Sequence, residues 1–500
     1  MQSQPPTPRG DCRARGSLRA SALLALLAAS SAAQYLPVAG LESVDYSGPS
    51  VSGHALQRLA VFHPNCTPPP DGFPVVVSVS NSGLASTTLF DDVHTGHGPL
   101  YHLLDAGFAL VSVSATYSDF GAPYKGKGLF HPPGHRPPVW VGPPPYADPT
   151  RPMAEKDMVM AMQHLRHHAS SLGLDPERIV QHGRSGGAIV AMWTALGPER
   201  GAMTFLGGSG QELQSTRPAA AILQSGCFYF PAWKQNSPNL PSGHLPHASG
   251  APLWLLPAGT LAQSLSNWQV QASALVYQDA ALNAALPVYL TYGEGSPSSD
   301  FTPATPGGTD YVEDVLSGPH SAWHGFVWKT LYPEAARLVL TDTEPLQAST
   351  SLHDALIEDE AARSLDMIAW LEDALVLQSA WEDAGHPLVA PAQEQPLLLG
   401  CGPLQAGSLN QVGASGLPAS SEVLLVVGWE RVAWPFAGGV LVPSPDLVLA
   451  LDTDEAGVAQ LPFVLPAASP PVEMWMQVWA LDPDAPHGLV ATNALSGRVE

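Results

Sequence analysis

Short hydrophobic runs recur along the first three quarters of the chain and predict buried strands. The clearest runs cover residues 59–62, 73–80, 108–115, 179–182, 219–224, 286–292 and 337–341. Uninterrupted apolar runs of this length are typical of a parallel sheet that is covered on both faces. Residues 153–172 and 354–373 instead repeat apolar positions every three or four residues, which predicts amphipathic helices. The alternation of strands and helices predicts an α/β domain with a doubly wound, mainly parallel sheet.

The pattern changes after residue 384. Short strands are predicted at residues 423–427, 440–442, 447–451 and 474–480, separated by turns rich in Gly, Pro, Ser and Asp. This spacing predicts a small all-β, sandwich-like domain. We therefore expect an α/β domain over residues 34–384, a linker over 385–396 and a C-terminal β domain over 397–500.

The N-terminal residues 1–33 have the pattern of a secretory signal peptide. Four arginines precede an apolar segment at residues 22–29, and small residues follow at 31–33. This order of basic, apolar and small residues is typical of a cleaved signal. No other apolar run reaches the length of about 18 residues that a membrane-spanning helix needs. We expect a secreted or periplasmic protein without an integral membrane segment.

The net charge of the chain limits its possible partners. The formal net charge of −23 disfavours nucleic acid and anionic membranes as partners.

The cysteines of the mature chain are few. Cys12 lies in the expected signal peptide, which leaves Cys66, Cys227 and Cys401. Three cysteines allow one disulfide and one remaining thiol in an oxidising compartment. The chain has no C-x-x-C pattern, so its sequence does not predict a zinc site with thiolate ligands.

The most informative motif is Gly183-Arg184-Ser185-Gly186-Gly187, which fits G-x-S-x-G. It lies between the apolar run 179–182 and a helix-compatible stretch that begins at Ala188. A serine on a sharp turn between a strand and a helix is the arrangement of a nucleophile elbow. The two outer glycines remove side chains that would collide where strand and helix meet. Ser185 is the candidate nucleophile.

The order of these parts resembles the α/β-hydrolase family, in particular carboxylesterases and feruloyl-esterase-like enzymes. The segments that carry the resemblance are residues 74–83, 103–118, 172–191 and 286–295, within a region of about 50–375. Residues 477–495 resemble a tail domain found on secreted planctomycete-type bacterial proteins. The resemblance implies a serine hydrolase that cleaves carboxylic esters without a cofactor.

The family order of catalytic residues is serine, acid and histidine. His353 follows the last predicted strand and precedes the closing helix, so the resemblance makes it the base. His320 and His324 precede the penultimate helix and are the weaker candidates. Asp314, in EDVLSGP, resembles the acid position of the family, with Glu294 and Asp300 as alternatives.

The oxyanion loop departs from the family pattern. The family usually has His-Gly-Gly, whereas this chain has Asn81-Ser82-Gly83. Because the donors are backbone N–H groups, the substitution need not abolish the oxyanion hole. Ser82 or Gly83, together with Gly186, are the expected donors.

The remaining histidines give no metal signature. His164 and His168 would share one face of a helix, but no glutamate follows His164, so the zinc-protease motif is absent. We expect no metal site and a packed position for His182. A surface or pocket-rim position is expected for His164 and His168 and for the histidines His94, His97, His102, His131 and His135. Two alternatives remain open: a peptidase of the same fold, and an inactive scaffold that binds a surface or carbohydrate. In either case the C-terminal domain is a candidate for binding a cell surface or polymer.

Overall fold

The computed structural model describes residues 44–45, 58–79, 99–113, 153–184, 186–196, 213–224, 285–293, 334–341, 360–390 and 395–499. The chain divides into two compact units. The α/β unit consists of Gln34–Pro64 and Pro70–Gln378, and the β unit contains Ser379–Glu500 together with the short segment Asn65–Pro69. No helix in the described part of the chain is both long and apolar enough to cross a bilayer.

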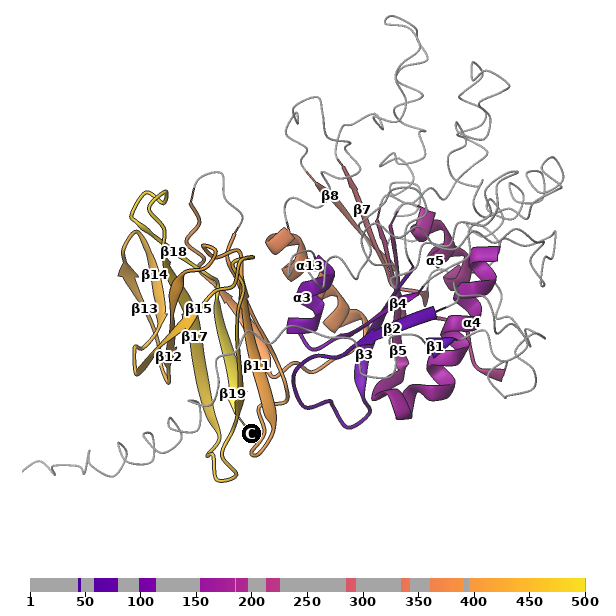
Figure 1. Ribbon diagram of the computed structural model, residues 1–500, viewed down its shortest axis with the longest axis horizontal. Coiled ribbons are helices and arrows are strands. Elements are labelled where there is room, and N and C mark those ends of the chain that lie inside the picture. Colours follow the sequence, from indigo (N-terminus) through magenta and orange to yellow (C-terminus); the bar gives the residue numbers. More distant parts are fainter. Residues whose placement is uncertain are drawn as a thin grey trace, which may run out of the picture. The chain divides into compact units, whose positions relative to one another are not determined.

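The α/β unit is built on an eight-stranded sheet in the order β1-β2-β4-β3-β5-β6-β7-β8. Strands β3 to β8 run parallel to one another, whereas at one edge β2 pairs antiparallel with β4, and β1 pairs antiparallel with β2. The mainly parallel α/β sheet predicted from the sequence is thus confirmed (Figure 1). The strands are β1 (Val44–Asp45), β2 (Arg58–Phe62), β3 (Phe73–Val79), β4 (Ala109–Val113), β5 (Leu174–Arg184), β6 (Ala220–Gln224), β7 (Val288–Gly293) and β8 (Ala336–Thr341).

Helices cover both faces of this sheet. The helices are α3 (Pro99–Asp105), α4 (Met153–His168), α5 (Gly186–Leu196) and α13 (Glu360–Ala374), and a short 3-10 turn, η2 (Ala169–Leu172), follows α4. A side chain on Gly183 would run into the start of α5, so this residue faces α5. Tyr289 contacts Asp366 and Trp370 of α13. In the sheet, Tyr289 pairs with Ile222, and Ile222 pairs with His182, the residue before Gly183. Because successive residues of a strand face opposite ways, α13 and α5 lie on opposite faces. Figure 1 shows α3 beside α13, and α4 beside α5.

One predicted boundary is confirmed and another is wrong. The helical segment expected over residues 153–172 ends before Gly173, whose φ is 65°, although its last turn is 3-10. Strand β5 begins at Leu174 rather than at Ile179, and its register against β3 shifts at Pro176, between the pairs Phe73–Leu174 and Val75–Ile179. Proline has no N–H to donate to the ladder, so an irregularity is expected at this point.

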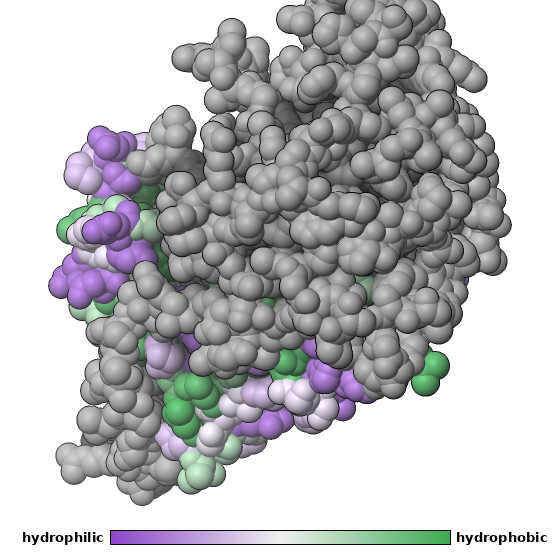
Figure 2. All heavy atoms as spheres, turned by 45° about the vertical axis from the view of Figure 1, so that its right-hand side comes forward, coloured by the Kyte–Doolittle hydropathy of each residue, from purple (hydrophilic) through white to green (hydrophobic). Residues whose placement is uncertain are grey.

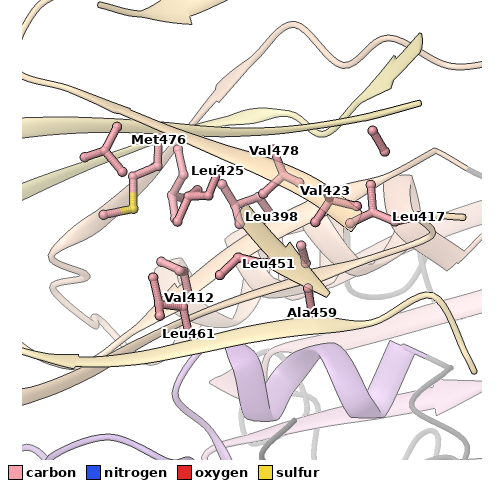
Figure 3. Packing of buried hydrophobic residues seen from close by; sticks show 14 of the residues in the cluster. Leu398, Val412, Leu417, Val423, Leu425, Leu451, Ala459, Leu461, Met476 and Val478 are labelled. Carbon is pink, nitrogen blue, oxygen red and sulfur yellow. The ribbon is translucent and has the colours of Figure 1, made fainter. Parts of the chain in front are cut away.

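The β unit consists of antiparallel sheets that share one core. One sheet has the order β10-β11-β16 and another the order β15-β12-β17-β19-β9. Apolar side chains at every second position of both sheets form the core, and Figure 3 shows Leu425, Val478 and Leu461 among the side chains that meet there. The strands are β10 (Leu397–Cys401), β11 (Leu409–Ser415), β12 (Glu422–Gly428), β15 (Leu447–Asp452), β16 (Ala459–Val464), β17 (Val472–Leu481), β18 (Leu489–Ala491) and β19 (Ala494–Val499). Two antiparallel sheets packed face to face match the sandwich-like pattern of the sequence.

The β unit begins before the stretch that the sequence analysis assigned to a linker. Strand β9 (Trp381–Gly385) pairs with β19, and Leu388 forms a bridge with Ala491. Trp381 anchors this strand, because its indole N–H donates to Gly402 O at 3.0 Å and its ring packs on Gly400. A side chain on Gly400 would come within 2.7 Å of that ring. The tryptophan fixes residues 381–385 as an edge strand, which their polar sequence WEDAG did not indicate.

A short hairpin lies on the outer face of the larger β-unit sheet. It pairs β13 (Arg431–Phe436) with β14 (Gly439–Pro443), and it buries Val426, Trp475 and Trp479. Two of its own aromatic rings stay in contact with solvent: Trp434 is 54% exposed and Phe436 48% exposed. Figure 2 shows how hydrophobic residues lie among hydrophilic ones on one face of the described surface.

The cysteines form no disulfide in the described part of the chain. Cys66 and Cys401 are both buried in the β unit. Cys227 lies outside the described residues.

Candidate active site

The expected nucleophile turn lies between the centre of the sheet and a helix. Strand β5 ends at Arg184 and α5 begins at Gly186, so Ser185 occupies the single position between them. At Gly183, a Cβ atom would overlap the carbonyl group of Gly187 and come within 2.5 Å of Ala188 N. Only glycine at 183 allows strand and helix to approach this closely. The strand–turn–helix context predicted from G-x-S-x-G is therefore present, although Ser185 itself lies outside the described residues.

In the chain, the other candidates follow the carboxyl ends of parallel strands. The carboxyl ends of parallel strands meet at one edge of a sheet, which is where open α/β sheets bind ligands. Strand β3 ends at Val79, shortly before Ser82 and Gly83, and β7 ends at Gly293, directly before Glu294. Ser82, Gly83, Glu294, Asp300 and Asp314 lie outside the described residues, so their assignments stay predictions.

The position of His353 in the chain order can be stated from the described elements. Strand β8 (Ala336–Thr341) is the last strand of the sheet, and α13 begins at Glu360. His353 falls between these two elements, whereas His320 and His324 fall between β7 and β8. All three histidines lie outside the described residues, and the choice of His353 as the base stays a prediction.

Gly186 is the one expected oxyanion donor within the described residues. It is the first residue of α5, an eleven-residue helix. The first N–H groups of a helix have no partner within the helix and lie at the positive end of its dipole. A backbone N–H at this position can stabilise an oxyanion that forms beside Ser185.

His182 is packed, as the sequence predicted, and it has a defined hydrogen-bond partner. Its Nδ1 atom lies 2.9 Å from the hydroxyl oxygen of Ser78 on β3. His182 is 4% exposed and Ser78 is 5% exposed. Ser78 was not among the predicted site residues, although a polar residue within the apolar run 73–80 indicates a buried polar contact.

The histidines of α4 differ from the expectation in one respect. His164 is buried rather than on a surface or pocket rim, and its ring lies 4.4 Å from the ring of His168. Burial, and then the neighbouring His167, lower the pKa of His168. Among the described residues, no group of three or more potential ligands is arranged to hold a metal ion.

Polar contacts fix α13 to the sheet and to α3. Tyr289 on β7 donates a hydrogen bond to Asp366 at 2.8 Å, and Arg337 on β8 forms an ion pair with the same carboxylate. Burial, followed by the contact with Asp366, raises the pKa of the Tyr289 phenol. On the same helix, the hydroxyl of Ser364 lies 2.8 Å from Nδ1 of His102 on α3. His102 is therefore buried between two helices, and the surface or pocket-rim position expected for it is wrong. These partners are so distant in the chain that no local pattern indicates them.

Comparisons with known proteins give structural likenesses only. No protein-family model matches the chain, and no curated protein matches it. An esterase from Thermogutta terrifontis with bound butyrate is 14% identical, with a TM-score of 0.38 over 68% of this chain and 96% of its own. A truncated carbohydrate esterase from gut microbiota is 13% identical, with a TM-score of 0.40 over 70% of this chain and 99% of its own. An acetyl ester-xyloside bifunctional hydrolase from Caldicellulosiruptor lactoaceticus is 13% identical, with a TM-score of 0.37 over 64% and 90%.

Proposed function

We propose that the protein is a secreted serine hydrolase that cleaves carboxylic esters. The observation that carries this proposal is the tight turn between β5 and α5, where a Cβ atom on Gly183 would overlap the Gly187 carbonyl. A serine held on such a turn, beside the N-terminus of a helix, is suited to attack an acyl carbon. Secretion rests on the signal-like residues 1–33.

The proposed reaction uses three side chains and two sets of backbone donors. The Ser185 hydroxyl attacks the ester carbonyl carbon while His353 accepts the hydroxyl proton, and the carbonyl oxygen becomes an oxyanion. N–H groups of Ser82 or Gly83 and of Gly186 stabilise this oxyanion. His353 then gives the proton to the departing alcohol, which leaves an acyl-enzyme. Water, activated by the same histidine, releases the acid and regenerates Ser185.

The acid that orients His353 is the least constrained member of the triad. We propose Asp314, because its sequence context resembles the acid position of α/β-hydrolases. Glu294 directly follows the end of β7 at Gly293 and is the alternative that the described strand favours. Asp300 is the third candidate. Separate Asn or Gln replacements at these positions would distinguish them by loss of kcat.

A fluorophosphonate probe tests the proposed function directly. We expect stoichiometric labelling of the folded full-length protein, with the adduct located on Ser185 by peptide mass spectrometry. We also expect turnover of a short-chain chromogenic ester and none of a matched peptide anilide. Ser185→Ala is the control, since it removes only the attacking hydroxyl.

Two results would contradict the proposal in different ways. Folded protein that neither reacts with the probe nor hydrolyses any ester would indicate an inactive scaffold. Labelling of Ser185 together with faster turnover of the anilide than of the ester would indicate a peptidase.

For the β unit we propose a second role, the binding of a polysaccharide-containing surface. Trp434 and Phe436 alternate along β13 and are each about half exposed. Phe436 is held edge-on against Trp479, with ring centroids 5.0 Å apart. Exposed aromatic rings at fixed positions mark interaction sites, and their flat faces suit the C–H faces of sugar rings.

Co-sedimentation of the full-length protein with insoluble xylan or cellulose tests this role. Trp434→Ala is expected to weaken binding at least about tenfold, the effect of a central aromatic contact. Turnover of a soluble ester is expected to stay unchanged. Leu481→Ala is the matched control, because Leu481 is 73% exposed but is not aromatic. Equal binding by the Trp434→Ala variant and the wild type would rule out this use of the hairpin.

A further inference from the structure

One buried hydrogen bond joins the two strands that lead to the proposed catalytic groups. Ser78 and His182 are register partners in the parallel ladder of β3 and β5, and Ser78 Oγ lies 2.9 Å from His182 Nδ1. Both side chains are at least nine-tenths buried. A hydrogen bond shielded from water is electrostatically stronger than an exposed one, so this contact resists separation of the strands.

The hydrogen bond lies near the carboxyl ends of both strands. Among the described residues, one further pair, Val79 with Gly183, follows it in the ladder. Strand β3 ends at Val79 and continues to Ser82 and Gly83, while β5 ends at Arg184 and continues to Ser185. In the chain, the two proposed halves of the oxyanion hole follow a few residues after Ser78 and His182.

We propose that Ser78 and His182 are positioning residues for catalysis. By fixing the spacing between the ends of β3 and β5, they set the distance between the donors at Ser82 or Gly83 and the turn at Ser185 and Gly186. This inference rests on the proposed esterase function. Oxyanion donors must lie about 2.7–3.1 Å from the developing charge, and a misplacement of about 1 Å can cost roughly 100-fold in rate.

The expected kinetic effect is confined to the chemical step. The oxyanion exists in the transition state and not in the bound substrate, so a widened hole lowers kcat and leaves KM nearly unchanged. A purely structural role predicts something else: a loss of stability without a selective loss of kcat in the protein that remains folded.

The α/β unit offers a chemically matched control. Ser364 Oγ lies 2.8 Å from His102 Nδ1, and both residues are buried on the face of the sheet that α13 covers. Ser78→Ala and Ser364→Ala therefore delete the same hydroxyl from the same type of serine–histidine pair. The Ser364 pair joins two helices, α3 and α13, rather than the two strands that lead to the site.

The experiment compares these variants by urea unfolding and by ester kinetics. We expect both to lower the unfolding midpoint, and only Ser78→Ala to lower kcat by about 10-fold to 100-fold with KM within about twofold of wild type. His182→Leu should behave as Ser78→Ala does. His182→Asn, whose amide can reach the Ser78 hydroxyl from near the Nδ1 position, should recover most of kcat.

The outcomes separate this inference from the function on which it rests. Wild-type kcat in Ser78→Ala, in a protein whose Ser185 still reacts with a fluorophosphonate, overturns the positioning role and leaves the esterase function intact. An equal loss of kcat in Ser364→Ala also overturns it, because the effect would then be general destabilisation. A wild-type protein without ester turnover or labelling overturns both proposals.

Discussion

Replacing His353 with alanine is expected to lower kcat for ester hydrolysis by about 10^4-fold to 10^6-fold. Without an adjacent base, the Ser185 hydroxyl stays protonated and is a poor nucleophile at neutral pH. His353 is expected to be the base because of its position in the chain. It lies between β8, the last strand of the sheet, and α13, so its loop starts from the carboxyl edge at which the β5–α5 turn lies. Steady-state kinetics with a chromogenic ester measure the loss.

The controls for this prediction are His320→Ala and His324→Ala. Both residues lie between β7 and β8, one strand before the expected position of the base, and each variant should retain most of kcat. The double variant Ser185→Ala/His353→Ala should lose little more than either single variant, because a triad acts as a unit. Near-normal turnover in His353→Ala, with a collapse in His324→Ala, would move the role of the base to His324.

Replacing Gly183 with alanine is expected to prevent the end of β5 and the start of α5 from packing as closely as they do in the native fold. The added Cβ would overlap the Gly187 carbonyl and approach Ala188 N to 2.5 Å. Both neighbours are backbone atoms, which cannot rotate away as the end of a side chain can. We expect a loss of at least about 3 kcal/mol in the free energy of unfolding, at the upper end of overpacking effects. In any protein that folds, displacement of Ser185 by about 1 Å should lower kcat at least about 100-fold.

Gly439→Ala is the control for this substitution. A Cβ at Gly439 would meet side-chain atoms of Leu388 at 3.2 Å and of Trp479 at 3.4 Å, which can shift by a few tenths of an ångström. It should reduce stability only slightly and leave ester turnover unchanged. Thermal unfolding and kcat are measured for both variants. A Gly183→Ala protein with wild-type stability and kcat would show that the turn is not as tight as the contact with Gly187 indicates.

The sequence by itself determined the layered part of the α/β unit. Apolar runs such as residues 73–80 and 219–224 correspond to the buried parallel strands β3 and β6. A strand that is covered on both faces is apolar at nearly every position, so it can be recognised in the sequence as a hydrophobic run. The sequence also determined the β5–α5 turn, since Gly183 carries no Cβ atom that would collide with the backbone of Gly187 and Ala188. These are local properties, and a local pattern is sufficient to express them.

Only the tertiary structure decided which distant residues meet. Ser78 and His182 lie 104 positions apart, and His102 and Ser364 lie 262 apart, so no spacing in the chain indicates either hydrogen bond. Strand β9 was hidden for the same reason: its polar residues become a strand because Trp381 packs on Gly400 and because β19 supplies the backbone partners. The periodicity of a segment indicates which of its faces is buried. Which other segment packs against that face depends on how distant parts of the chain come together, and a local pattern does not contain that information.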